Sequence, residues 1–344
     1  MPLYRKVEHI PIAQFKNLVE SDRFQSWIHV PISLHRACSQ MHNPVLQGDE
    51  IGLILILNEK DQLVAYLGLL PDEISIQNRK IKISWLSCIW VDPACRGQGL
   101  GKQLVSEALL VKTYLAATDF TQEAEQLYIQ TQSFHSHFIQ SGKRFYTRMS
   151  LAKILPKKNK KWKLWIPVLH CIDQFVNYLI DLRKKDDLDS KISSYRGPAL
   201  EETISLKNEW IQNYPWILES QTQKEPRYYF SSFETLFKQG WIQSAGGENT
   251  YVFVIHRNET LKIIYHCCVS EDDYLMAVQS ILDYARKKKI DLIICYDDVL
   301  NRNLSQKILI RRGCKRKFLL TTQEKLNQDD IAYMSKLRGD FIFT

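Results

Sequence analysis

The stretch Val91–Lys102 reads V-D-P-A-C-R-G-Q-G-L-G-K and joins two different hydrophobic patterns. The preceding segment, Ile83–Val91, is strand-like. The following segment has the spacing of a helix with one apolar face. Glycines leave the backbone N–H groups unshielded, and a helix N-terminus adds partial positive charge. Together with the guanidinium of Arg96, this arrangement predicts a loop that binds an anion.

The glycine spacing excludes two common phosphate-binding loops. Gly97, Gly99 and Gly101 are spaced G-x-G-x-G, whereas a dinucleotide-binding fingerprint requires G-x-G-x-x-G. A Walker loop requires Ser or Thr after Gly-Lys, but Gln103 follows Lys102. The loop therefore belongs to neither class. A glycine-rich connector without a ligand is the alternative.

The run R-G-x-G-x-G, with V-D-P ahead of the arginine, resembles motif A of the GNAT superfamily of acyl-CoA-dependent N-acyltransferases. The resemblance implies that the loop grips the pyrophosphate of coenzyme A, with acetyl-CoA as co-substrate and no metal. It also implies that backbone groups at the end of the preceding strand pair with the pantetheine amides. The residues assigned to these contacts are Ile89, Trp90, Val91, Arg96, Gly97, Gln98, Gly99, Leu100, Gly101 and Lys102.

A second element of the family resembles the segment that begins at Thr121. Thr121, Ala124 and Tyr128 follow the spacing of the family's N-x-x-A-x-x-x-Y element, with threonine where asparagine is common. The resemblance implies that Thr121 contributes to the coenzyme A site. It also implies that Tyr128 protonates the departing thiolate, which is sensible because a phenol is protonated at neutral pH. The alternative for Tyr128 is an ordinary aromatic residue on a buried face.

The general base is not identified by the sequence. The family often places a glutamate on the strand before motif A, but this strand contains no carboxylate. Proton removal through water leaves five residues open, and none is preferred: Asp72, Glu73, His29, His35 and His42.

Length and composition are those of an ordinary globular protein with roughly two domains. The 344 residues carry a formal charge of +8, which suits an anionic co-substrate; we expect no nucleic-acid partner. The eight cysteines include no C-x-x-C pair, which favours reduced thiols and a cytoplasmic protein. The first residues do not resemble a signal peptide.

The last strands of the first half are expected around Phe138–Gln140 and Phe145–Leu151. The order of elements repeats in the second half, where the expected elements are helices at 199–212 and 232–239, strands at 251–256 and 261–269, a helix at 274–289, a strand at 291–296, a helix at 304–312 and strands at 316–321 and 340–344. We predict an α/β fold of tandem GNAT-like domains, each a mixed, mostly antiparallel sheet flanked by helices. The expected segments are an acyl-CoA-binding catalytic domain at 1–155, a linker helix at 156–191 and a degenerate domain at 192–344. In the second domain, Ser270-Glu271-Asp272-Asp273 stands where the glycine loop should be. These carboxylates would repel a diphosphate, so we expect that half to bind no coenzyme A.

The linker combines a lysine-rich run, 153–163, with an interrupted apolar helix, 165–182. Adjacent basic and aromatic residues are compatible with a membrane surface. A helix that packs between the two domains is the preferred interpretation, so membrane contact is not expected. A homodimer is left open.

The sequence therefore predicts an N-acyltransferase that moves an acetyl or short acyl group from acyl-CoA to a primary amine of a small molecule or peptide. The first alternative is a non-catalytic acyl-CoA sensor, because no base is evident. The second is a membrane-peripheral or interaction protein organised around residues 157–182.

Overall fold

A computed structural model describes residues 6–41, 43, 46, 48–76, 79–112, 114–183, 195–196, 237–243, 251–257, 259–266, 268 and 270–321. The chain forms two compact units. The first unit comprises Met1–Gln140, Leu200–Phe233 and Lys315–Thr344, and the second comprises Ser141–Ala199 and Glu234–Cys314. The division therefore does not run along the chain in two consecutive blocks, unlike the domains predicted from the sequence.

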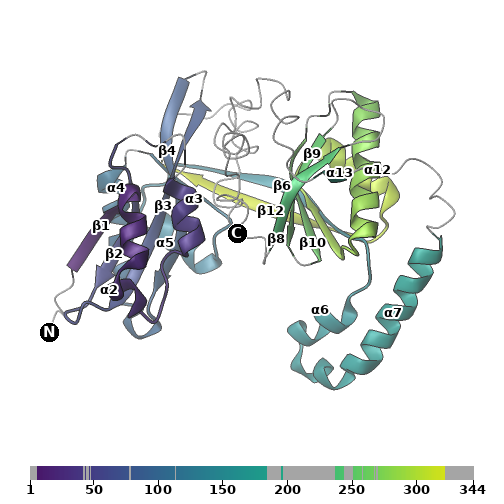
Figure 1. Ribbon diagram of the computed structural model, residues 1–344, viewed down its shortest axis with the longest axis horizontal. Helices are drawn as coiled ribbons and strands as arrows, with labels where there is room; N and C mark the ends of the chain where they lie inside the picture. Colours follow the sequence, from purple (N-terminus) through teal and green to yellow (C-terminus); the bar gives the residue numbers. More distant parts are fainter. Residues whose placement is uncertain are drawn as a thin grey trace. The chain divides into compact units, whose positions relative to one another are not determined.

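The first unit contains a mixed sheet (Figure 1). Neighbouring strands are antiparallel from β1 to β4, parallel between β4 and β5, and antiparallel again between β5 and β12. The order across the sheet is β1 (Lys6–Pro11), β2 (Ile51–Leu57), β3 (Leu63–Ile76), β4 (Arg79–Val91), β5 (Leu115–Thr118), β12 (Arg311–Leu320) and β6 (Ser136–Tyr146).

Both faces of this sheet are covered, as the almost continuous apolar sequence of β2 predicts. Ile54 and Ile56 pack with α4 and α5, whereas Leu53, Leu55 and Leu57 pack in a second cluster with the N-terminal helices. Successive side chains of a strand point to opposite faces, so one strand serves both cores. The helices are η1 (Ile12–Gln14), α1 (Phe15–Glu20), α2 (Asp22–Gln25), α3 (Leu34–Met41), α4 (Leu100–Val111) and α5 (Gln122–Gln130).

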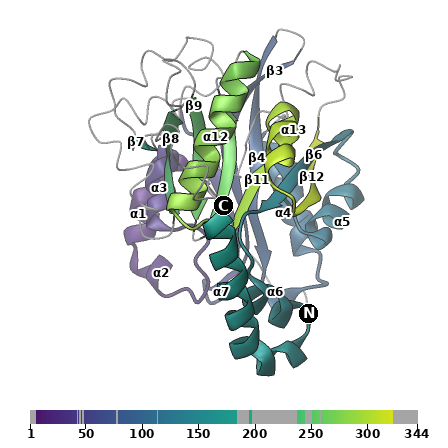
Figure 2. The same ribbon diagram turned by 90° about the vertical axis from the view of Figure 1, so that its right-hand side faces the viewer.

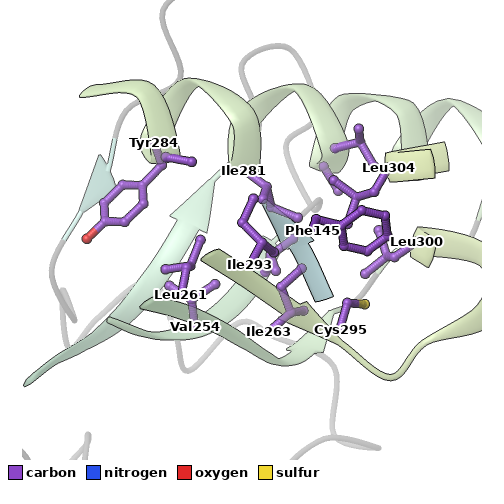
Figure 3. Close-up of a cluster of buried hydrophobic side chains, with 14 of the residues drawn as sticks. Phe145, Val254, Leu261, Ile263, Ile281, Tyr284, Ile293, Cys295, Leu300 and Leu304 are labelled. Atoms are coloured by element: carbon purple, nitrogen blue, oxygen red, sulfur yellow. The ribbon is translucent and has the colours of Figure 1, made fainter. Parts of the chain in front are cut away.

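The second unit repeats this strand pattern. Its strands follow the order β7 (Tyr195–Arg196), β8 (Phe237–Gln243), β9 (Tyr251–Arg257), β10 (Thr260–His266), β11 (Leu292–Cys295) and β6. β10 and β11 are parallel, and the other neighbouring strands of this unit are antiparallel. Helices α12 (Glu271–Lys287) and α13 (Asp298–Lys307) share one apolar core with these strands, part of which is drawn in Figure 3.

Two strands, β6 and β12, are each part of a sheet formed mainly by the other half of the sequence. In the first unit the neighbour of β5 is β12, which comes from the C-terminal half of the chain. In the second unit the neighbour of β11 is β6, which comes from the N-terminal half. Each unit therefore completes its sheet with a strand from the other half of the sequence, although local patterns predicted consecutive strands within each half.

The strand predicted near Phe145–Leu151 is wrong at its C-terminal end. β6 is one strand that ends at Tyr146, and α6 (Leu151–Lys158) begins at Leu151. The carboxylate of buried Asp173 accepts hydrogen bonds from the backbone N–H groups of Leu151 and Ala152, at 2.8 and 2.9 Å. This satisfies two donors that the first turn of a helix leaves open and fixes the helix start.

Residues 151–183 form a helical excursion, here called the 151–183 hairpin. It consists of α6, η3 (Lys160–Trp165) and α7 (Ile166–Arg183) and is attached to the second unit at one end (Figures 1 and 2). Near the attachment, Asn177 of α7 binds the backbone of Met149 through both its side-chain oxygen and nitrogen. Among the described residues, no helix combines the length and the apolar character required to cross a membrane.

Other predicted elements of the second half have mixed outcomes. The strands at 251–256 and 261–269 and the helix at 274–289 are confirmed with small shifts, whereas the helix predicted at 304–312 begins earlier, at Asp298. Asp297 explains that start, because its side chain caps the helix by accepting from the Leu300 N–H. Residues 237–239, predicted as helix, belong to β8. The expected helix 199–212 and strand 340–344 lie outside the described residues.

Candidate functional site

The predicted anion loop connects β4 to α4. Asp92 begins it: its Oδ1 accepts from the Ala94 N–H at 2.8 Å and shapes the single turn Pro93–Cys95. Gly97 and Gly99 have φ angles of +77° and +80°, which residues with a Cβ rarely adopt. A Cβ built at either position meets nothing within 4 Å, so the space beside the loop is open. Gly99 is also the N-cap of α4, whose first backbone N–H groups therefore lie beside this space.

The remaining loop residues divide into exposed residues and residues packed against the first unit. Arg96, Gln98 and Lys102 are exposed, and Arg96 Nε lies 3.4 Å from the Val91 carbonyl oxygen. The Leu100 side chain is buried in the core of the first unit, so only its backbone can face a ligand. Gly101 permits close packing of α4 on α5, because a Cβ there would lie 3.0 Å from a Leu127 methyl carbon.

β4 and β5 separate at the start of this loop. Their parallel pairing covers Ser84–Leu86 of β4 among the described residues, yet β4 continues to Val91. Leu86 is thus the last β4 residue paired with β5. The backbone of Ile89, Trp90 and Val91 consequently lies beyond the paired region, where the resemblance to motif A places the pantetheine.

A bulge on β4 marks the point of separation. The register with β3 shifts between Tyr66 and Gly68, so that Cys88 and Ile89 lie opposite one residue, and Cys88 has a φ of +54°. Gly68 makes the close approach possible, because a Cβ there would lie 2.7 Å from the Ser87 carbonyl oxygen. No local pattern in the sequence predicts this bulge, because a bulge depends on pairing between strands.

Arg36 of α3 reaches the bulge. Its guanidinium donates to Ser87 Oγ through Nη2 and to Cys88 Sγ through Nη1, the latter at 3.0 Å. The site therefore includes a basic side chain more than 50 positions away along the chain. No local pattern around Arg36 could have identified it.

Aromatic residues cover the neighbouring face of β4. Trp90 is stacked on Tyr66 at 5.5 Å between ring centroids, and His29 lies 4.3 Å from Trp90. Burial, with a smaller effect of Cys88, raises the pKa of Tyr66, so its hydroxyl is protonated at neutral pH. These rings therefore form an aromatic cluster close in sequence to the bulge on β4.

The structure places the candidate bases unequally. His29 is exposed beside Trp90, while Asp72 is buried and accepts a hydrogen bond from Trp85 Nε1 at 2.8 Å. The side chains of Glu73 and His35, and the whole of His42, lie outside the described residues. No metal-binding group of three His, Cys, Asp or Glu side chains occurs in the described part of the chain.

Tyr128 lies in the core of the first unit, with only 3% of its surface exposed. Its ring contacts Phe120 edge-on at 5.8 Å and Phe134 at 5.3 Å. The position agrees with the family spacing and also with an ordinary buried aromatic residue, so the general-acid role stays a prediction.

Thr121 is the N-cap of α5, and its side chain accepts a hydrogen bond from the Ala124 N–H at 3.3 Å. The pKa of nearby Glu123 is lowered by hydrogen bonds from the backbone N–H of Glu123 and from the side chain of Thr121, and the charge of Arg96 lowers it further.

The corresponding strand end in the second unit carries a contact between two side chains. β10 pairs with β11 only over Thr260–Lys262, whereas its pairing with β9 extends to His266. There, His266 Nε2 lies 3.0 Å from Asp297 Oδ2, a contact that joins the end of β10 to the residue preceding α13. The N-terminus of α12 is already satisfied by a capping box between Ser270 and Asp273.

Comparison with known proteins was made by sequence and by fold. Residues 50–149 match the family model described as an acetyltransferase (GNAT) domain. No curated protein matches the sequence. Among solved structures, N-myristoyltransferase from Saccharomyces cerevisiae with bound myristoyl-CoA has a TM-score of 0.50 at 11% identity, covering 96% of this chain and 87% of that one.

A GCN5-related N-acetyltransferase from Kribbella flavida has a TM-score of 0.48 at 10% identity, covering 92% of this chain and 71% of that one. At these identities the likeness concerns the fold. The sequence match locates the family in the part of the chain that contains β2 to β5, the anion loop and α5. Residues 50–149 are therefore a GNAT acetyltransferase domain, within a mixed α/β fold of the kind that GNAT proteins adopt.

Proposed function

We propose that the protein transfers an acetyl or other short acyl group from acyl-CoA to a primary amine of a small molecule or peptide. The observation that carries the proposal is the open space in front of α4, where Gly97 and Gly99 expose backbone N–H groups directly after the separation of β4 and β5. Such an arrangement fits a diphosphate at the helix N-terminus and an extended pantetheine beside the unpaired strand.

The acyl donor would be held in three parts. The loop from Arg96 to Lys102 binds the diphosphate with backbone donors and two exposed cations. The backbone of Ile89 to Val91 pairs with the pantetheine amides. Backbone N–H groups near the bulge at Cys88 polarise the thioester carbonyl and stabilise the negative charge that develops on its oxygen.

The transfer itself is a direct displacement. The neutral amine nitrogen attacks the thioester carbonyl carbon, a base takes the amine proton, and the carbon–sulfur bond breaks. Tyr128 donates its proton to the departing thiolate of coenzyme A. The residue that acts as the base is not assigned. Among the candidates, His29 is the exposed one, and its ring lies beside Trp90.

The second unit serves a different purpose in this proposal. Its strand order repeats that of the first, and we infer that it is a degenerate copy without acyl-CoA binding. Support comes from the His266–Asp297 contact at the open end of β10 and from the acidic first turn of α12. Both features remove what a diphosphate requires.

Calorimetry with acetyl-CoA, paired with a thiol-release assay on a panel of amines, tests the function. We expect one binding site per chain and thiol release that depends on an amine. Binding without release on any amine would favour the acyl-CoA sensor, since the site would be intact and the chemistry absent. No heat with acetyl-CoA would contradict both functions.

A further inference from the structure

The 151–183 hairpin presents an unusual surface at its tip. The nine successive residues 160–168, with sequence K-K-W-K-L-W-I-P-V, are all exposed. Leu164 is 88% exposed and Trp165 is 56% exposed. Large apolar side chains are costly to leave in water, and a contiguous exposed group of them marks an interaction surface.

The exposed apolar surface continues along α7 as a stripe. Its members are spaced i, i+3, i+7, i+10 and i+14, which places them within one narrow face of a helix. Each is between 42% and 63% exposed. The stripe residues are Trp165, Val168, Ile172, Phe175 and Leu179.

A different face of α7 holds the hairpin together. Leu169 and Asp173 are buried, and Asp173 and Asn177 bind the backbone at and just before the start of α6. The contacts within the hairpin therefore use one side of α7 and leave the apolar stripe exposed.

The charge of this surface has one sign. Between Leu151 and Ile172 the sequence contains six lysines and no acidic residue. Lys153 forms ion pairs with Glu259 and Asp291 at 3.0 and 3.1 Å, so its charge is compensated within the protein. Lys158, Lys160, Lys161 and Lys163 are exposed next to the apolar stripe.

We propose that the 151–183 hairpin docks on the surface of an anionic phospholipid bilayer. The apolar stripe would enter the boundary between headgroups and acyl chains, and the lysines would lie at the level of the lipid phosphates. Tryptophan is suited to this interface because its ring is apolar while its N–H can bond to water or headgroups. The sequence alone favoured packing against protein; the exposure of the stripe reverses that preference.

Charge complementarity selects the lipid surface over a second copy of this chain. Each lysine near an anionic surface strengthens binding by about fivefold. A second copy would bring a second block of lysines to the same contact, and like charges oppose association. The docking requires no acyl transfer and can be tested separately from the proposed function.

Co-sedimentation of the full chain with vesicles tests the inference. Vesicles of phosphatidylcholine alone are compared with vesicles that also contain phosphatidylglycerol. We expect binding to the anionic vesicles that weakens as NaCl is added. Replacing Lys160, Lys161 and Lys163 by Gln should lower the partition coefficient on the order of 100-fold.

A matched control exists in the same unit. Lys287, Lys288 and Lys289 are also exposed, so replacing these three by Gln removes the same charge from another element. We expect that control to change binding by less than about threefold. The pair Trp165→Ser and Phe175→Ser should weaken binding by at least about tenfold, because both side chains leave the interface.

Circular dichroism and thermal melts check that each variant is folded. If a variant is not folded, the salt dependence of vesicle binding by the unaltered protein tests the proposal instead. Absence of vesicle binding would overturn the proposal. So would binding that is equal on both vesicle types and insensitive to salt. A dimer in light scattering that the Trp165→Ser and Phe175→Ser changes dissociate, without vesicle binding, would instead assign the stripe to a second copy.

Discussion

Gly99→Ala is the substitution that most directly tests the anion loop. Gly99 has a φ of +80° at the N-cap of α4, and a Cβ there meets no atom within 4 Å. The alanine therefore introduces backbone strain without a clash, which costs roughly 1–2 kcal/mol in the left-handed region. Relief of that strain would turn the first N–H groups of α4 and place a methyl group beside them. We expect the affinity for acetyl-CoA to fall about tenfold, equivalent to about 1.4 kcal/mol.

Gly48→Ala is the matched control, because Gly48 has a φ of +63° and the same open surroundings within the first unit. Urea denaturation should show a similar loss of stability in both variants, and calorimetry should show weaker acetyl-CoA binding in Gly99→Ala alone. Equal affinities in the two variants would refute the assignment of the loop. An unchanged unfolding midpoint in both would refute the strain argument.

Three further outcomes follow from individual contacts. Tyr128→Phe keeps the packing but removes the proton donor, so turnover should fall roughly 100-fold at unchanged acetyl-CoA affinity; an unchanged rate in the thiol-release assay would remove Tyr128 from the mechanism. Asp173→Ala leaves the first N–H groups of α6 without their acceptor and should lower the free energy of unfolding by about 1–3 kcal/mol; a urea midpoint equal to that of the unaltered protein would contradict the capping role. Burial opposes ionisation of Asp297, but the hydrogen bond and charge of His266 and the N–H groups of α13 outweigh it and lower the pKa of Asp297. Because the pKa of Asp297 is lower in the folded state, its ionised carboxylate stabilises the fold at pH values above the ordinary pKa of about 4. That stability is lost as the pH falls from about 4 through the folded-state pKa. Asp297→Asn should therefore flatten the acid limb of a stability–pH curve, and an unaltered limb would show that the pair contributes nothing.

The sequence predicted the strand, the turn and the helix around the anion loop because those features are local. A strand, a turn, glycines and a helix follow one another within twenty residues from Ile83 to Lys102, and each depends on backbone preferences of neighbouring residues. The side chains that gather around the bulge could not be predicted in this way. Arg36, Tyr66 and His29 meet β4 only because separate strands and helices pack together.

What the sequence by itself determined is the class of fold and the strand–loop–helix order around the glycines, since hydrophobic period and glycine spacing act along the chain. Tertiary structure alone decided which strands complete each sheet. β6 and β12 have no local signal for their partners, because pairing across hundreds of residues is set by the fit of whole sheet edges. It also decided that the stripe on α7 is exposed, since an apolar helical pattern reads the same whether its face is covered by protein or not.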